Sequence, residues 1–202
     1  MKSTMPYYGV ASPEQRRIFR SVFAAIRFDT FEDWRDAVLG LWRGARHREE
    51  RYAAIALAGH RRYRPWQRPE MLAVYEEMIE TGAWWDYVDA IAIHLIGDEL
   101  LRRYTVEIKP VMLAWSSDSN LWKRRASIIC QIAFKRETDL ELLHACIQPN
   151  LGDRDFFIRK AIGWALRQHA WTDPEKVRHY VAANKSRLSG LSTREALKNI
   201  GH

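Results

Sequence analysis

The sequence predicts an all-α protein, an α-solenoid of antiparallel helix pairs that curves around a concave basic face. Apolar residues recur at helical spacing along nearly the whole chain, and no alternating run bounded by turn residues indicates a strand. Helix-capping residues follow one another between these apolar runs. The 202 residues are 47% hydrophobic, which is enough to form a core within one domain.

An internal echo favours a solenoid over an irregular bundle. Trp122-x-x-Arg125-Ala126 and Phe156-x-x-Arg159-x-Ala161 match at an offset of 34 residues, and each opens an apolar helix. Helix pairs that repeat at about 35–45 residues are typical of HEAT-like solenoids, whose concave face binds extended partners. We therefore expect residues 1–202 to form a single HEAT-like repeat domain, with a compact irregular bundle as the alternative.

Capping and stop signals divide the first half of the chain into successive helices. Ser12 as N-cap with Pro13 in the first turn predicts the first helix. Three glycines, at positions 59, 82 and 97, are predicted helix ends. The apolar stripe of the first helix is Ile18, Val22, Phe23 and Ile26. The helices should begin near residues 12, 30, 47, 70 and 84, with a basic, proline-marked connection over 61–69.

The second half repeats this pattern. Thr172-Asp173-Pro174-Glu175 is a clear helix start, since Asp caps the first turn and Pro fits its first position. The other cap candidates are Asp118, Asp139, Asp153 and Ser192. Helices are expected near 99–104, 106–115, 120–134, 139–147, 153–169, 173–183 and 192–200.

The charge balance suits a polyanionic partner. The chain carries a net charge of +7, and 24 of its 32 basic residues are arginines, whose planar fork grips phosphate at two points. Arg-rich codon usage or a need for solubility would give the same balance. The charge therefore favours nucleic acid without deciding for it.

The sequence lacks the residues that several classes of protein need. Cys130 and Cys146 lie in apolar helical runs and suggest neither a disulfide framework nor a zinc site. The seven histidines are scattered, and no metalloprotease motif, Gly-rich phosphate loop or nucleophile elbow occurs. No stretch approaches the length of a membrane span or a secretory signal. We expect a reduced cytoplasmic location, associated with the nucleoid when DNA is bound, and no membrane partner.

One cluster of residue types suggests a site. Trp85 and Asp89 in the run Trp84-Trp85-Asp86-Tyr87-Val88-Asp89 are four apart, so they share one helix face. Arg125 lies on a later helix and meets them only if the fold brings the helices side by side. An aromatic ring, an anion and a cation at one concave point would be unusual for stability alone.

Four motifs follow one another along the chain: the tryptophan–aspartate run continuing to Leu95-Ile96-Gly97-Asp98, then the segments 117–126, 156–167 and 191–198. In this order they resemble the AlkD-type DNA alkylation repair family, a group of HEAT-like DNA glycosylases. The resemblance covers essentially the whole chain, which makes it specific.

The resemblance implies a monofunctional glycosylase that hydrolyses the bond between deoxyribose and an N3- or N7-alkylated purine in duplex DNA, without base flipping. The family's catalytic cluster falls on Trp85, Asp89 and Arg125, and its further cleft aromatic falls on Trp164. No metal or organic cofactor is implied, and we expect a monomer. The basic residues expected to contact DNA are Arg124, Arg159, Lys160, Arg167, Arg194 and Lys198.

The chemistry fits these residue types independently. Alkylation makes the purine cationic, so it leaves as a neutral base and needs no strong general acid. The barrier lies in an oxocarbenium-like sugar, which a carboxylate such as Asp89 stabilises. Trp85 and Trp164 offer electron-rich faces to a cation, worth ~0.5–2 kcal/mol each. Arg125 is expected to grip a backbone phosphate and to help keep Asp89 ionised.

Each of these residues also has a plainer interpretation. Trp85 suits a buried core, and Asp89 suits a staple to Arg125 between repeats. The cations suit an ordinary solvated face. The functional alternative is a HEAT-repeat DNA-binding or scaffold protein without turnover; a solenoid that binds protein instead of DNA is disfavoured by the charge.

The start of the chain departs from the family's pattern. In the family's pattern an N-terminal helix or two should precede the position of residues 1–8, so we expect those helices to be missing. End repeats of solenoids need a polar outer surface. The first repeat is then expected to expose an apolar face, with reduced stability or self-association, and monodisperse sedimentation would argue against this.

Overall fold

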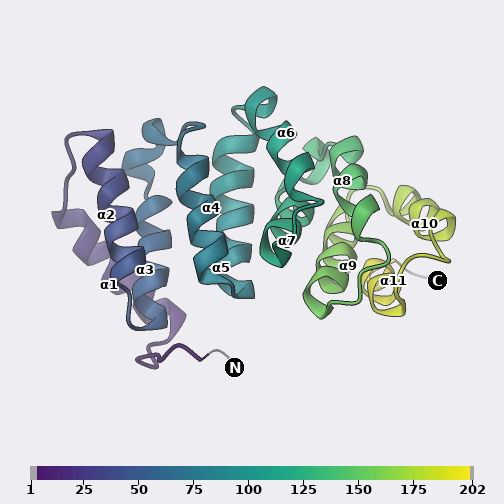
Figure 1. Cartoon of the computed structure of the whole chain (residues 1–202), viewed down its shortest axis with the longest axis horizontal. Coiled ribbons are helices and arrows are strands. Elements are labelled where there is room, and N and C mark those ends of the chain that lie inside the picture. The colour runs from purple at the N-terminus through teal and green to yellow at the C-terminus, as the bar shows by residue number, and fades with distance from the viewer. Residues whose placement is uncertain (1–3, 201–202) are drawn as a thin grey trace.

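The computed structural model describes residues 4–200, which are helical along most of their length and include no strand. The helices form an α-solenoid (Figure 1), as expected from the sequence. The principal helices are α1 (Ser12–Ala25), α2 (Phe31–Gly44), α3 (Arg48–Ala58), α4 (Met71–Gly82), α5 (Trp85–Ala90), α6 (Thr105–Trp115), α7 (Leu121–Ile129), α8 (Leu140–Ile147), α9 (Phe156–Ala170), α10 (Pro174–Ala183) and α11 (Gly190–Leu197). Shorter or tighter elements are η1 (Arg61–Trp66), η2 (Ile91–Leu101), η3 (Lys135–Glu137) and η4 (Gln148–Asn150).

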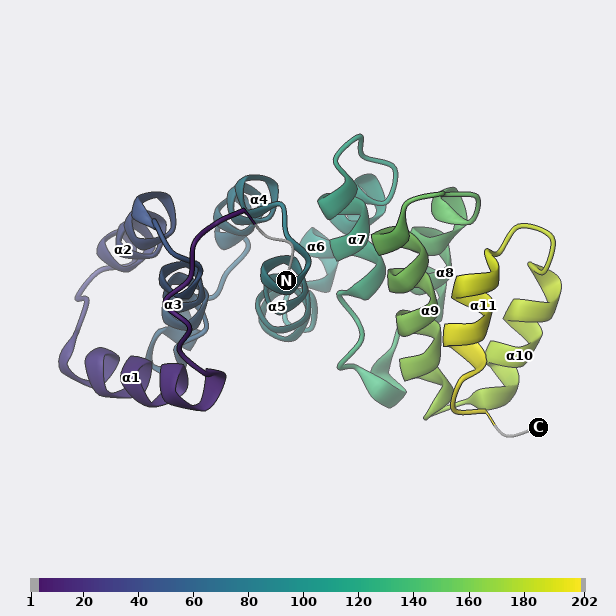
Figure 2. The same cartoon turned by 90° about the horizontal axis from the view of Figure 1, so that it is seen from below.

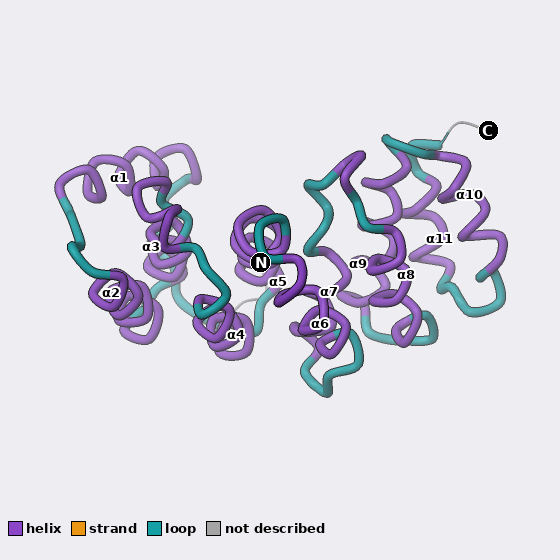
Figure 3. Tube along the Cα trace, turned by 90° about the horizontal axis from the view of Figure 1, so that it is seen from above, coloured by secondary structure: helices purple, strands orange, loops and turns teal. Residues whose placement is uncertain are grey.

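The odd-numbered helices form one continuous layer. Helix α3 packs on α1 and α5, α7 packs on α5 and α9, and α11 packs on α9. Even-numbered helices pair beside them, α2 with α4 and α6 with α8. Figures 2 and 3 show this row bending, so that α1 and α9 stand on either side of α5. Side chains from four successive odd helices, α5, α7, α9 and α11, line one hollow.

The core runs through the whole solenoid as one cluster. It extends from Phe23 near one end to Ala196 near the other, and it buries Trp34, Trp42 and Tyr75 almost completely. Aromatic rings bury much apolar surface each, so they account for much of the stability of stacked repeats. None of the helices within residues 4–200 is both long and apolar enough to cross a membrane.

The observed caps agree with the predicted ones in part. Asp139 and Asp173 cap α8 and α10, accepting hydrogen bonds from Leu142 N and Lys176 N. Four predicted caps are wrong by one or a few residues, because a neighbouring side chain or backbone group takes the position. The N-caps of α1, α7, α9 and α11 are Ala11, Asn120, Asp155 and Ser189 in place of Ser12, Asp118, Asp153 and Ser192.

Three predicted boundaries are also wrong. Gly97 does not end a helix, because α5 continues directly into the π-helix η2, which runs through Gly97 to Leu101. The predicted helix at 99–104 is therefore not a separate element, since its first residues belong to η2. The helix predicted over 120–134 ends at Ile129. The connection predicted over 61–69 contains the 3-10 helix η1, with Pro65 inside it.

Helix α1 exposes much of its apolar stripe. Phe23 is buried, whereas Ile18, Val22 and Ile26 are 41%, 48% and 37% exposed. The apolar outer face expected of the first repeat is therefore present.

The segment before α1 is tied to the start of α3. The Glu49 carboxylate accepts hydrogen bonds from the backbone N–H groups of Tyr8, Gly9 and Val10, and Tyr8 stacks on His47 with ring centroids 3.9 Å apart. In Figure 1 this segment passes beneath the lower ends of the first helices.

Candidate functional site

Trp85 and Asp89 begin and nearly end the short helix α5, one turn apart. Trp84 is the N-cap and is half-buried against the core, so the chain turns into the helix directly before Trp85. Trp85 is 38% exposed, an unusual position for so large a ring, while the Asp89 side chain is 13% exposed. Both line the same groove, so the predicted shared helix face is confirmed.

Helix α7 supplies the cation. Arg125 donates from Nε to Asp89 Oδ1 at 2.7 Å and from Nη2 to Oδ2 at 2.8 Å. Its Nη1 donates to the backbone oxygen of Phe157 at 2.6 Å, and the residue is 5% exposed. Each of the three guanidinium nitrogens thus donates one hydrogen bond within the protein. Arg125 therefore orients Asp89 and acts to keep it ionised, as expected from the sequence. Its contact with a DNA phosphate stays a prediction.

Gly97 allows η2 and the end of α7 to approach each other closely. A Cβ on Gly97 would lie 2.0 Å from the backbone oxygen of Cys130, the C-cap that follows α7. Only glycine tolerates such a close approach of two backbones. Because η2 continues from α5, Gly97 sets how closely the helix carrying Asp89 approaches the helix carrying Arg125.

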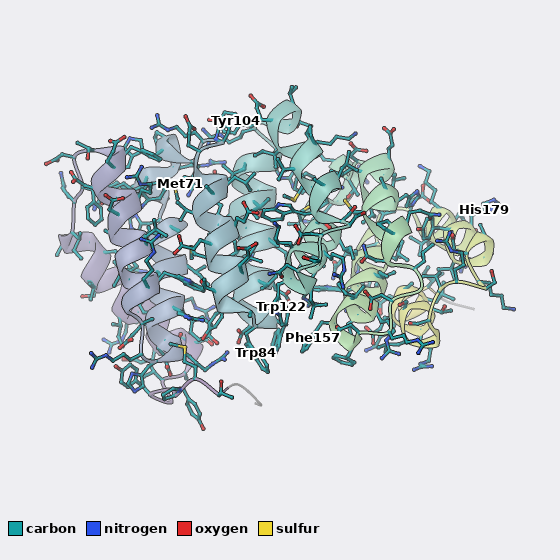
Figure 4. All side chains as sticks on the ribbon, viewed as in Figure 1. Met71, Trp84, Tyr104, Trp122, Phe157 and His179 are labelled. Carbon is teal, nitrogen blue, oxygen red and sulfur yellow. The ribbon has the colours of Figure 1, made fainter. Side chains whose placement is uncertain are left out.

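Aromatic rings pack together beside the Asp89–Arg125 pair. Figure 4 shows Trp84, Trp122 and Phe157 gathered at the lower ends of α5, α7 and α9. The Phe157 ring lies 5.0 Å from that of Trp122 and 6.3 Å from that of Trp84. This packing shields the Arg125–Phe157 hydrogen bond from solvent, which strengthens it.

The environment of Asp89 favours its neutral form more than water does. Burial raises the pKa of Asp89, and the nearby charge of Asp86 raises it further, while the hydrogen bonds and charge of Arg125 act to lower it. The net direction is upward. An aspartate held like this is a stronger base than a solvated one, yet it keeps a cationic partner directly behind it.

Asp86 belongs to a second buried network. Arg48 from α3 donates to Asp86 Oδ2 at 2.5 Å, and the Tyr52 hydroxyl donates to the same oxygen at 2.7 Å. Burial is the main cause that raises the pKa of Tyr52, so the hydroxyl remains a donor at neutral pH. Helix α5 is thus fixed on one side by α3 and on the other by α7, each through an arginine.

Two connected hollows form the groove. The smaller, of about 290 Å³, is lined by the Asp89–Arg125 pair together with Trp85 and Trp164. The larger, of about 1260 Å³, shares Trp85, Asp89 and Trp164 and extends toward η3 and the end of α9. The structure therefore brings together the three predicted catalytic residues and the predicted cleft aromatic.

The predicted DNA-binding cations are placed differently from one another. Lys160 and Arg167 line the smaller hollow, but Glu195 of α11 binds both, at 2.9 and 2.6 Å. Arg124 is held by Asp153 and Asn150, away from either hollow. Arg159, Arg194 and Lys198 do not line these hollows either. Sequence reasoning missed Glu195, because nothing in its spacing indicates that α11 packs on α9.

Within residues 4–200, no group of three or more His, Cys, Asp or Glu side chains is arranged to hold a metal ion.

The fold and this groove define the class of protein: an α-solenoid that presents an arginine-bound carboxylate among aromatic rings that line a groove. The sequence matches the family model for the DNA alkylation repair enzyme over residues 1–200. The structure is similar to a solved structure described as a predicted DNA alkylation repair enzyme from Enterococcus faecalis, with a TM-score of 0.80 and 25% identity over 96% of this chain and 88% of that chain. Comparison with curated proteins gave no match. The chain belongs to the DNA alkylation repair enzyme family.

Proposed function

We propose that this protein is a monofunctional DNA glycosylase, which hydrolyses the N-glycosidic bond of cationic N3- or N7-alkylated purines in duplex DNA. The observation that supports it most is the Asp89 carboxylate, held by both oxygens to Arg125 in a groove that Trp85 also lines. A groove that only bound phosphates would gain nothing from a negative charge there.

In the proposed reaction the bond between C1′ and the purine nitrogen breaks, and its electron pair stays with the departing base. The base is cationic before this step and neutral after it, so it needs no proton from the protein. Asp89 stabilises the positive charge that develops on the sugar and orients the water whose oxygen adds to C1′. That water then gives up one proton to the solvent. The abasic site and the free base are the products.

Each neighbour of Asp89 has a distinct part in this proposal. Arg125 fixes the carboxylate geometry before substrate arrives, which avoids reorganisation during the reaction. Trp85 on α5 and Trp164 on α9 both line the groove, and their faces attract a cationic base or sugar. The groove is open along its length, a shape that suits a lesion read within the duplex without base flipping.

One observation favours a second candidate, a DNA-binding solenoid without turnover. Both oxygens of Asp89 accept from Arg125, and Glu195 joins α9 to α11 through two cations. Pairs of this kind also serve as staples between neighbouring helices.

The decisive experiment is release of 7-methylguanine from a defined duplex by wild type and by Asp89→Asn, with DNA binding measured in parallel. Loss of release by about 100-fold with affinity kept supports the glycosylase. Binding without release by wild type supports the second candidate. Glu107→Gln, which removes an exposed carboxylate outside the groove, controls for the change in net charge.

A further inference from the structure

The η3 turn carries cations that the protein itself does not use. Within residues 4–200, the side chains of Lys135 and Arg136 have neither an ion pair nor a hydrogen bond, and both are exposed. They line the larger hollow, the one that also contains Asp89. The groove cations Lys160 and Arg167 are by contrast held by Glu195. A cation without a protein partner binds a phosphate at a lower free-energy cost, because no existing ion pair has to break.

The turn is anchored, so the backbone that carries the two cations is held in place. Arg102 from the segment after η2 donates to the backbone oxygen of Ala133 at 3.1 Å and pairs with Glu137. Its guanidinium lies 3.9 Å from the centroid of the buried Phe134 ring. One arginine thus fastens residues on both sides of Lys135 and Arg136. Lys135 itself has φ of 55°, a left-handed conformation that turns the chain sharply at this point.

Trp171 stands beside the same hollow, at the end of α9. It follows Trp164 by seven residues, about two helical turns, so the two rings lie along one side of α9. Trp171 is 70% exposed, although tryptophan is seldom left in water. Exposed tryptophans beside cations are typical of interface residues whose ring is buried by a partner.

We propose that Lys135, Arg136 and Trp171 form a second contact with the DNA backbone, away from the catalytic cluster. The two cations bind phosphates of one strand, and the Trp171 ring packs on a neighbouring deoxyribose of that strand. The proposal rests on the proposed function only for the identity of the partner, DNA, and not on turnover.

The test measures the affinity of the full chain for an undamaged duplex by fluorescence polarisation across a range of salt concentrations. Plots of log K against log salt should have a negative slope for wild type. Lys135→Ala and Arg136→Ala should each reduce the magnitude of that slope by about 1, because each removes one phosphate contact. Trp171→Ala should weaken binding about tenfold at every salt concentration and leave the slope unchanged. All three side chains are exposed, so a melting curve should show intact folding.

Matched controls are available on the surface. Lys185→Ala removes an exposed lysine that lines neither hollow, and Val106→Ala shortens a side chain that is 85% exposed. Neither should change the slope or the affinity.

The outcomes separate this proposal from the glycosylase proposal. Unchanged slopes in both cation variants, or undiminished affinity in Trp171→Ala, would overturn the second contact even if wild type releases base. The predicted slopes in a protein that releases no base would support the contact and count against the glycosylase. Absence of salt-dependent binding by wild type would overturn the contact outright.

Discussion

Arg125 binds both carboxylate oxygens of Asp89 and, through its remaining Nη1 group, the backbone oxygen of Phe157. One buried side chain thus connects α5 and α7, which carry the candidate catalytic residues, with α9, which carries the cleft aromatic Trp164. The same contacts that hold the solenoid together orient the carboxylate. Stability and activity are therefore expected to respond together when this pair is changed.

Arg125→Met should lower the free energy of unfolding by about 3–5 kcal/mol, because it leaves the buried Asp89 carboxylate without its cationic partner. Urea denaturation measures this. Arg43→Met is the matched control: Arg43 also forms two hydrogen bonds to one carboxylate, that of Glu77, but the Arg43 side chain is 60% exposed. Its loss should cost less than about 1 kcal/mol. Equal costs for the two variants would show that burial does not set the strength of the Arg125 pair.

The rate of base release should fall at acid pH as Asp89 becomes protonated. Only the carboxylate stabilises a developing cation, so activity is present above the pKa of Asp89 and is lost as pH falls through it. Burial raises this pKa, so the inflection should lie above the value of about 3.9 for a solvated aspartate. Release must be corrected for spontaneous loss of base from the same duplex.

A variant tests the cause of that inflection. The charge of Asp86 adds to the rise in the pKa of Asp89, so Asp86→Asn should move the inflection to lower pH. An inflection at or below that of a solvated aspartate in wild type would contradict the assignment of Asp89 as the active carboxylate.

The sequence predicted the fold class and the central cluster because both depend on local spacing. Helical periodicity is a property of each segment, and Trp85 and Asp89 share a face simply because they are one turn apart. Arg125 lies on another helix, so spacing alone named it as a candidate without placing it beside them, and the resemblance to a family assigned it to the same cluster. The structure then confirmed that these three residues meet at one groove.

Features set by contacts between distant segments were not predictable. Glu195 reaches Lys160 and Arg167 only because α11 packs on α9. The sequence likewise places Trp171 after a helix without indicating that its ring stays in solvent. The end of α7 at Ile129 has a similar origin, since the next residue, Cys130, presents its backbone oxygen to η2.

Gly97→Ala tests how much that contact between η2 and α7 matters to the site. The new Cβ would overlap the backbone oxygen of Cys130, and a backbone atom cannot move aside as a side chain can. Overpacking should cost about 3 kcal/mol of unfolding free energy. It should also separate Asp89 from Arg125, and a misplacement of about 1 Å lowers rates by about 100-fold.

Gly40→Ala is the matched control for this substitution. Gly40 lies within α2, and a Cβ there meets nothing within 4 Å. Alanine favours helix over glycine by about 1 kcal/mol, so this variant should be stabilised and fully active. Denaturation and base release measured on both variants separate helix propensity from close packing. If Gly97→Ala proved as stable and as active as Gly40→Ala, the spacing of α5 and α7 would not depend on the contact at Gly97.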